Sequence, residues 1–141
     1  MMWSTPVVKV ASLAINKHNF PTSSIVTTRS FIKRQENTVR KFIRGFVQGV
    51  HHGKTQRVFS IQVMQKYLRS SDAAIFGDLY DLYILQNIPR IPRPSAEALK
   101  TVMQQMAESD PRVAKLAPEQ FIDNRFFQEL DKGGFIQRLW K

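Results

Sequence analysis

The sequence contains no cysteine among its 141 residues, which excludes disulfides, thiolate zinc sites and cysteine nucleophiles. It also contains no apolar run near the roughly 18 residues that a membrane span requires. Its first 20 residues place Lys9 inside their only apolar stretch, with neither a basic region before it nor a small-residue cleavage site. We therefore expect no export signal in this chain, and a cytoplasmic location if it is expressed as written.

Acidic residues are scarce in the first half of the chain. Residues 1–71 hold twelve Lys and Arg against the single acid Glu36, whereas residues 72–141 hold nine against ten acids. The formal net charge of +10 points to polyanions such as nucleic acid or an anionic membrane. The apolar content of 43% is nevertheless enough to build the core of one ordinary domain.

Two β-prone stretches, residues 7–15 and 25–28, come first, and a turn-like segment at residues 18–24 separates them. Everything after Phe31 is predicted to be helix and connecting loop. We therefore expect a mainly α-helical fold with a short β element near the N-terminus. Residues 1–30 form the β-prone part and residues 31–141 the helical part of one domain. Two strands alone are marginally stable, so this β element needs a packing partner.

The first long helix carries an apolar stripe at positions i, i+3, i+4, i+7, i+8 and i+11. Its members are Val39, Phe42, Ile43, Phe46, Val47 and Val50. The other side of this helix is predicted to face water through Arg40, Lys41, Arg44 and Gln48. Gly49 and Gly53 are predicted to end the helix.

Three further helices are predicted, with N-caps at Thr55, at Ser71 or Asp72, and at Ser95. Each of the three has an apolar face. In the second helix this face is formed by Val58, Ile61, Met64 and Leu68, with Tyr67 beside them. The third helix has Ile75, Phe76, Leu79, Tyr80, Leu82 and Tyr83, and the fourth has Leu99, Val102, Met103 and Met106. The loop at residues 87–95 holds three prolines and is expected to be extended.

Catalytic and metal motifs are weak in this sequence. Adjacent His51 and His52 point about 100° apart on a helix, so they do not share one ion, and we read them as a polar helix end. Asp78 and Asp81 lie one turn apart and are read as a solvated face in preference to an acid/base pair. The segment 89–92 matches P-x-x-P but is explained by a spacer between two helices. We therefore predict no enzyme activity, no catalytic residue, no metal site and no cofactor.

The basic face of the first long helix leaves one alternative open. Clustered Lys and Arg on one helix face are typical of a phosphate binder, and the chain would then be a small basic helical nucleic-acid-binding protein. The simpler interpretation is that a helix burying one side must present a polar side to water. No helix-turn-helix pair, aromatic RNA-binding strand or zinc module accompanies the charge, so nucleic acid is not the favoured partner.

Three blocks of the sequence, taken in order, resemble a known family. They are 25-IVTTRSFIK-33 leading into 38-TVRKFIRGFVQGV-50, then 65-QKYLRSSD-72 with 76-FGDLYDLY-83 and the loop 89-PRIPRPS-95, and finally 121-FIDNRFFQELDKGGFIQRLW-140. Together they are similar to the C-terminal part of ABC importer substrate-binding proteins, in the group that serves sulfonates, taurine, nitrate and the pyrimidine precursor of thiamine. Relatives start the first long helix with an Asn-Pro-acid cap, whereas this chain has Gln35-Glu36-Asn37, so its helix start is expected to be weaker.

The resemblance implies a partial type 2 periplasmic-binding-protein fold in which residues 1–30 are an inter-lobe segment. It implies a receptor whose two lobes close on a small molecule and deliver it to a membrane permease, in the periplasm or cell envelope. Most ligand contacts would come from a missing N-terminal lobe, so the ligand-binding residues stay unknown. Thr27 and Thr28 are the nearest guesses because they lie where the chain would pass between lobes.

Overall fold

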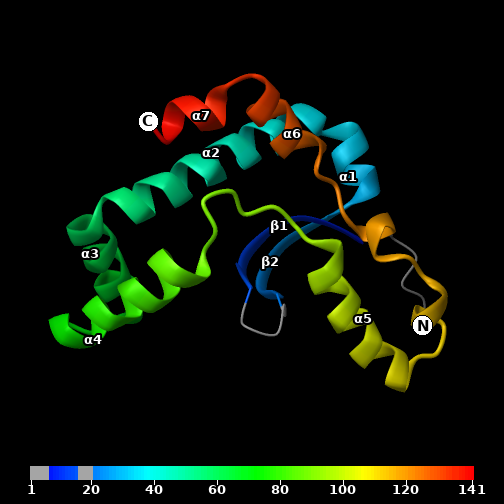
Figure 1. The fold of residues 1–141 in the computed structure, drawn as a ribbon, viewed down its shortest axis with the longest axis horizontal. Helices are drawn as coiled ribbons and strands as arrows, with labels where there is room; N and C mark the ends of the chain where they lie inside the picture. The colour runs from blue at the N-terminus through cyan, green and yellow to red at the C-terminus, as the bar shows by residue number, and fades with distance from the viewer. Residues whose placement is uncertain (1–6, 16–20) are drawn as a thin grey trace.

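A computed structural model describes residues 7–15 and 21–141 and shows a mainly helical chain with an antiparallel pair of strands at its start (Figure 1). The predicted fold class, mainly α with a short N-terminal β element, is confirmed at this level. The elements, in chain order, are β1 Val7–Ile15, β2 Pro21–Thr28, α1 Arg29–Arg34, α2 Glu36–Thr55, α3 Arg57–Leu68, α4 Ala73–Leu79, the π-helix η1 Tyr80–Asn87, α5 Ala96–Ser109, the 3-10 helices η2 Val113–Lys115 and η3 Pro118–Phe121, α6 Arg125–Lys132 and α7 Phe135–Leu139.

The second strand is longer than the sequence predicts. It starts at Pro21, and Ser23 and Ser24 pair with Ala14 and Ser12 of β1. The prediction of a turn over residues 18–24 is therefore wrong for residues 21–24, while residues 16–20 lie outside the described residues. Strand propensity depends on context, and pairing with β1 satisfies the backbone of these polar residues despite their low intrinsic preference.

The strand pair passes directly into the first helix. Thr28 caps α1 by accepting a hydrogen bond from the backbone N–H of Phe31 at 3.1 Å, so the helix begins at Arg29, two residues before the predicted start. A break at Gln35 separates α1 from α2. The side chain of Gln35 makes no capping hydrogen bond to α2, which agrees with the weak helix start expected from Gln35-Glu36-Asn37.

The long helix α2 continues through both glycines that were predicted to end it. Gly49 and Gly53 lie inside α2, which runs to Thr55, because an isolated glycine costs a helix only about 1 kcal/mol and does not by itself terminate it. The prediction that Thr55 caps the next helix is also wrong. Its hydroxyl donates back to the carbonyl of His51 at 2.9 Å, and Gln56 separates the two helices without a side-chain cap.

The core forms where α2 meets the end of the chain. Figure 1 shows α6 and α7 lying along α2. Four of the predicted stripe residues of α2 are buried, and Phe46 is partly buried, but Phe42 is 51% exposed and is an error of the prediction. The buried cluster is made of Ile32, Val39, Ile43, Val47, Phe126, Phe127, Leu130 and Ile136. Gly134, at φ +69°, makes the turn between α6 and α7 that folds α7 back onto α2.

The helices from α3 to η1 bury much less than predicted. Phe76 and Tyr80 are buried, as expected for the third helix, and Asp72 caps α4 through the N–H groups of Ala74 and Ile75, each at 3.1 Å. On α3, in contrast, Val58 is 72% exposed and Tyr67 is 78% exposed. The predicted buried faces of these two helices are therefore wrong for Val58, Tyr67, Leu68, Ile75, Leu82 and Tyr83, because no described part of the chain packs over them.

Helix α5 follows the proline loop. Ser95 caps it as predicted, accepting from the N–H of Ala98 at 3.3 Å. Of its predicted stripe, Met103 is buried and Met106 is exposed. The loop is irregular, and both Pro92 and Pro94 are buried in it, so Pro92 is not presented as part of a peptide ligand. Within the described ranges, no helix combines the length and apolar character needed to cross a bilayer.

Candidate functional site

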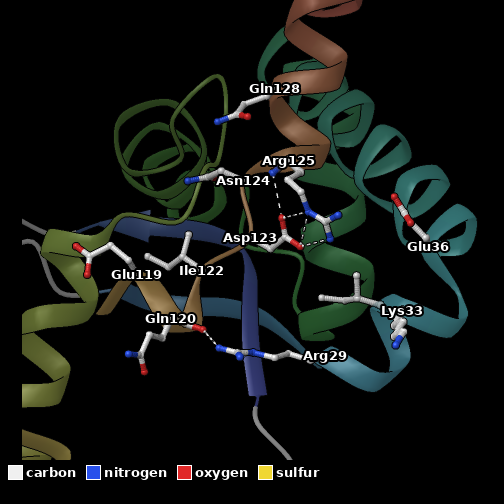
Figure 2. A pocket seen from close by; sticks show the side chains of 11 residues that line it. Arg29, Lys33, Glu36, Glu119, Gln120, Ile122, Asp123, Asn124, Arg125 and Gln128 are labelled. Carbon is white, nitrogen blue, oxygen red and sulfur yellow. Dashed lines mark hydrogen bonds and ion pairs between the residues drawn. The ribbon is translucent and has the colours of Figure 1, made fainter. Parts of the chain in front are cut away.

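A polar cleft lies between the start of the helical part and the segment that leads into α6. Its volume is about 630 Å³, and Figure 2 shows its side chains. One wall comes from α1 and the first residue of α2, and the other comes from η3, residues 122–124 and α6. The lining residues are Arg29, Ile32, Lys33, Glu36, Glu119, Gln120, Ile122, Asp123, Asn124, Arg125 and Gln128.

Asp123 is the most deeply placed charge in this cleft, with a side chain only 13% exposed. Its Oδ1 accepts from the backbone N–H and from Nε of Arg125, both at 3.1 Å, and its Oδ2 accepts from Nη2 at 2.8 Å. Burial raises the pKa of Asp123, but the hydrogen bonds and the charge of Arg125 outweigh this effect, and the net pKa is lowered. Asp123 is therefore an ionised, fully engaged group and not a free base.

Arg29 closes the cleft at the junction of β2 and α1. Its Nη2 donates to the backbone carbonyl of Gln120, which ties the strand ribbon to η3 (Figure 2). Asn124 sits on the opposite wall and donates from Nδ2 to the carbonyl of Pro94 at 3.4 Å, while its Oδ1 is buried without a hydrogen-bond partner among the described residues. The cleft is thus held by polar contacts between segments far apart in the sequence.

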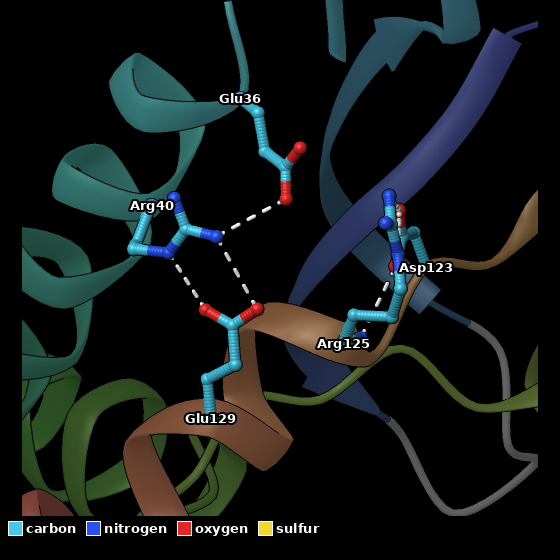
Figure 3. Close-up of polar contacts among 5 residues, drawn as sticks. All are labelled: Glu36, Arg40, Asp123, Arg125 and Glu129. Atoms are coloured by element: carbon cyan, nitrogen blue, oxygen red, sulfur yellow. Dashed lines mark hydrogen bonds and ion pairs between the residues drawn. The ribbon is translucent and has the colours of Figure 1, made fainter. Parts of the chain in front are cut away.

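A second polar cluster clamps α2 to α6 beside this cleft (Figure 3). Arg40 donates from Nε to Glu129 Oε2 at 2.7 Å and from Nη2 to Glu129 Oε1 at 3.3 Å. The same Nη2 donates to Glu36 Oε1 at 3.1 Å. The hydrogen bond to Glu129 is the main cause that raises the pKa of Arg40, and the same bond lowers the pKa of Glu129. Arg40, predicted to face only water, thus forms a tertiary contact.

The cleft is lined by charged side chains of both signs. Its lining holds three cations, Arg29, Lys33 and Arg125, and three acids, Glu36, Glu119 and Asp123, so the charges balance. No hydroxyl, imidazole or thiol side chain is part of this lining. Across the described residues, acidic and histidine side chains do not gather in groups of three that would hold a metal ion. A cleft of this kind suits a small polar molecule that carries both donors and acceptors.

The threonines and histidines that the sequence raised as candidates do not lie together in the structure. Thr28 is occupied as the cap of α1, and neither Thr27 nor Thr28 lines the cleft. His51 stands edge-on to the ring of Trp140 with centroids 4.8 Å apart, whereas His52 stands edge-on to Phe59 at 5.0 Å, so the two histidines diverge. They lie in the last turns of α2 and pack against aromatic rings.

The two acids of the third predicted helix also do not form a pair. Asp81 accepts from Arg57 Nη2 at 3.0 Å, while Asp78 is exposed. The structure therefore does not bring them together as an acid/base pair, and Asp81 serves to tie η1 to α3. The contact from Arg57 continues over the ring of Tyr80, whose centroid is 5.2 Å from the guanidinium carbon.

The basic face of α2 is only partly free. Lys41, Arg44 and Gln48 are exposed as predicted, but the Arg44 guanidinium carbon lies 4.4 Å from the centroid of Phe135 on α7. Five arginines of the described chain make ion pairs, namely Arg40, Arg57, Arg93, Arg112 and Arg125. Binding of nucleic acid stays a prediction, and retardation of duplex DNA at low salt that weakens steeply at moderate salt is its test.

The cleft residues from Asp123 to Arg125 were not identified individually from the sequence. The signal that marks them is the spacing Asp-x-Arg, in which the arginine folds back onto the acid two residues before it. The same geometry occurs at Asp110 and Arg112, where Nη2 and Oδ2 are 2.7 Å apart. The hydrogen bonds from Arg112 lower the pKa of Asp110 to about 2.

Comparison with protein-family models, with curated proteins and with solved structures finds no match to this chain. Function is therefore inferred from the residues, their contacts and the surfaces they leave exposed.

Proposed function

We propose that this chain is the C-terminal part of the substrate-binding component of an ABC importer, in the group that serves sulfonates, taurine, nitrate and the pyrimidine precursor of thiamine. In this proposal an N-terminal lobe outside these 141 residues completes a type 2 periplasmic-binding-protein fold. A small molecule binds as the two lobes close, and the loaded receptor delivers it to a membrane permease. The protein works in the periplasm or cell envelope and catalyses no reaction.

One observation carries this proposal: three consecutive elements, α3, α4 and η1, keep large apolar side chains in water. These side chains are Val58, Phe59, Tyr67, Leu68, Ile75, Leu82, Tyr83 and Leu85. Single exposed apolar residues need no explanation, but a series over adjacent helices marks a surface that another part of a protein covers. A lobe built around a sheet is a suitable cover for such helices, because sheets bury one or both faces against helices.

The packing of the first and third sequence blocks gives further support. Ile32, Val39, Ile43 and Val47 from the first block share one core with Phe126, Phe127, Leu130 and Ile136 from the third block. The polar cleft of about 630 Å³ opens at the junction of β2 and α1, next to these two blocks. In the proposal the strand ribbon is the inter-lobe segment, so the cleft lies where a second lobe would close.

The test joins the chain to an upstream lobe and measures ligand-dependent stability. The chain alone and the chain fused behind the N-terminal lobe of a taurine or nitrate receptor are each heated with taurine, an alkanesulfonate, nitrate or an aminopyrimidine. A ligand present at 100 times its Kd should stabilise the joined form by about 2.7 kcal/mol, seen as a rise in the unfolding midpoint. The chain alone should show no rise.

A matched variant tells whether the apolar surface is the joining surface. The double substitution Leu68→Gln and Leu82→Gln should leave the isolated chain as stable as before, because both side chains are exposed. It should remove the ligand response of the joined form. A joined form that responds to none of the four ligands contradicts the proposal, as does a double variant that responds fully.

A further inference from the structure

A second pocket lies where the end of α2 meets η1 and the end of α7. Its volume is about 460 Å³. His51, Lys54 and Thr55 of α2 form one wall, and Leu85 of η1 faces them. Arg90 from the proline loop and Trp140 after α7 complete the enclosure. Three stretches distant in the sequence, residues 51–55, 85–90 and 140–141, therefore converge on one small space.

The charged side chains that line this pocket are all cationic. Lys54, Arg90 and Lys141 line it, and no Asp or Glu does. None of these three cations pairs with a carboxylate of a described side chain. Burial lowers the pKa of Lys54, and the nearby charge of Arg90 lowers it further. Like charges at close range destabilise a fold unless an opposite charge sits between them.

The hydrogen-bond donors of the pocket are incompletely used. Lys54 donates one bond from Nζ to the carbonyl of Leu85 at 2.8 Å, which leaves two of its three N–H donors. The guanidinium carbon of Arg90 lies 5.1 Å from the ring centroid of Trp140, and none of its N–H groups has an acceptor among the described side chains. The indole Nε1–H of Trp140 is buried with no partner among the described residues. A buried donor without an acceptor is costly and calls for an explanation.

We propose that this pocket binds the oxyanion group of a small molecule, a phosphate or sulfate group held between Lys54, Arg90 and Lys141. The planar fork of an arginine and the point charge of a lysine are both suited to such groups. An anion seated here neutralises three converging cations and offers acceptors to donors that have none. The three cations come from separate segments and line one pocket, and they do not form a row along one helix, so a single anionic group fits better than a nucleic-acid backbone.

The anion site and the proposed receptor function share only Leu85, whose exposed side chain belongs to the apolar surface and whose carbonyl accepts from Lys54. The receptor proposal depends on the exposed surface of α3, α4 and η1 and on the cleft beside α1. The anion site depends on the end of α2, on Arg90 and on the end of α7. Either can fail while the other stands.

Titration of the intact chain with inorganic phosphate tests the anion site. The indole N–H resonance of Trp140 is followed by ¹⁵N–¹H NMR, and the variant Trp140→Phe assigns it, since the sequence has only two tryptophans. Sodium chloride at equal ionic strength is the reference titration. We expect a saturable shift of the Trp140 signal with phosphate, and with sulfate in a parallel titration, but not with chloride.

Two variants and one control decide which residues hold the anion. Arg90→Gln and Lys54→Gln should each raise the Kd for phosphate at least fivefold, whereas Arg34→Gln, an exposed arginine of α1, should change it less than twofold. Far-UV circular dichroism and the unfolding midpoint check that each variant is folded. If Lys54→Gln does not fold, Arg90→Gln alone decides, since Arg90 is exposed. No saturable shift in the unmodified chain, an equal shift with chloride, or an unchanged Kd in Arg90→Gln overturns the proposal.

Discussion

Two regions of this chain carry similar apolar stripes but bury them to very different extents. The stripe of α2 is covered by α6 and α7, so Ile43 and Val47 are fully buried. The stripes of α3, α4 and η1 are mostly uncovered, apart from Phe76 and Tyr80. The comparison shows that periodicity identifies an apolar face, whereas the identity of its cover depends on chain segments far away in the sequence.

Substituting one phenylalanine in each region should give the largest measurable difference between the two regions. Phe127 is 0% exposed in the cluster of α2 and α6, whereas Phe59 on α3 lies half in water. We expect Phe127→Ala to lower the free energy of unfolding by about 3 to 5 kcal/mol, from lost burial and the cavity that remains. Phe59→Ala removes a half-exposed ring and its edge contact with His52, and it should lower the free energy of unfolding by only about 1 kcal/mol.

Equilibrium unfolding in urea, followed by circular dichroism, measures both values. If Phe127→Ala no longer folds, Phe127→Leu, which removes less volume, takes its place beside Phe59→Leu. Similar losses for the two positions would mean that the α3 surface is covered in solution, and the contrast between the regions would then be wrong.

Local features of the fold could be predicted from the sequence. The helix cap at Ser95 and most of the α2 stripe follow from residue type and spacing alone, whereas the sequence left Ser71 and Asp72 as alternatives for the cap that Asp72 provides. The errors arise where a contact with a distant part of the chain determines the secondary structure or the burial of a residue. Residues 21–24 become strand because β1 pairs with them, and Phe42 is exposed because α6 and α7 cover the neighbouring side of α2. The faces of α3 and η1 were predicted to be buried, but apart from Tyr80 their large apolar side chains are mostly exposed, because the described segments cover these faces only in part.

A smaller effect is expected from the hydroxyl that joins η1 to α2. Tyr80 is 1% exposed, and its OH donates to the carbonyl of Lys54 at 3.0 Å. Tyr80→Phe should lower the free energy of unfolding by about 1 kcal/mol, the usual net value of such a bond. Tyr83→Phe is the matched control on the same helix, and it should be neutral because Tyr83 is exposed. Equal effects measured by urea unfolding would contradict the assignment of Tyr80 as the single buried anchor of η1.

Glycine in α2 offers a test in the stabilising direction. A Cβ added at Gly49 meets no atom within 4 Å, and the residue lies inside the helix. Gly49→Ala should therefore raise the free energy of unfolding by about 0.5 to 1 kcal/mol. Gly134→Ala should instead destabilise, because φ is +69° there and the added Cβ would lie 2.9 Å from Arg138 Nη1. Thermal unfolding should show a higher midpoint for Gly49→Ala and a lower midpoint for Gly134→Ala. A loss of stability in Gly49→Ala would show that α2 does end near the glycines.

The candidate site was less predictable than the fold. Lys33 and Asp123 are more than eighty positions apart, and only long-range contacts, such as the packing of α6 on α2 and the bond from Arg29 to Gln120, make them walls of one cleft. The balanced charge of the cleft is also invisible in a chain whose first half is strongly basic, since the neutralising acids Glu119 and Asp123 come from the second half. What the sequence does contain is the Asp-x-Arg spacing at residues 123–125, which fixes the local ion pair without any tertiary contact.

The smallest expected effect concerns the ion pair that holds α6 against α2. The hydrogen bond from Arg40 lowers the pKa of Glu129, helped by the charges of Arg40 and Arg125 and opposed by burial. Because the folded state holds this proton less tightly than the unfolded state, the contribution of Glu129 is present above its ordinary pKa near 4.5 and disappears as the pH falls through the lowered value. Both side chains are more than a third exposed, so screening keeps this contribution small.

Glu129→Gln should therefore lower the unfolding midpoint at pH 7 by only about 1 to 3 °C, and less in high salt. Unmodified chain and variant should converge once the pH has fallen through the lowered pKa, where Glu129 is protonated in both the folded and the unfolded state. Asp78→Asn removes an exposed acid that forms no ion pair with a described side chain, so its unfolding midpoint should match that of the unmodified chain at pH 7 and at low pH. A midpoint difference that persists at low pH would mean that Glu129 stabilises α6 through packing of its side chain and not through its charge, and the clamp between α2 and α6 would then rest on the apolar cluster alone.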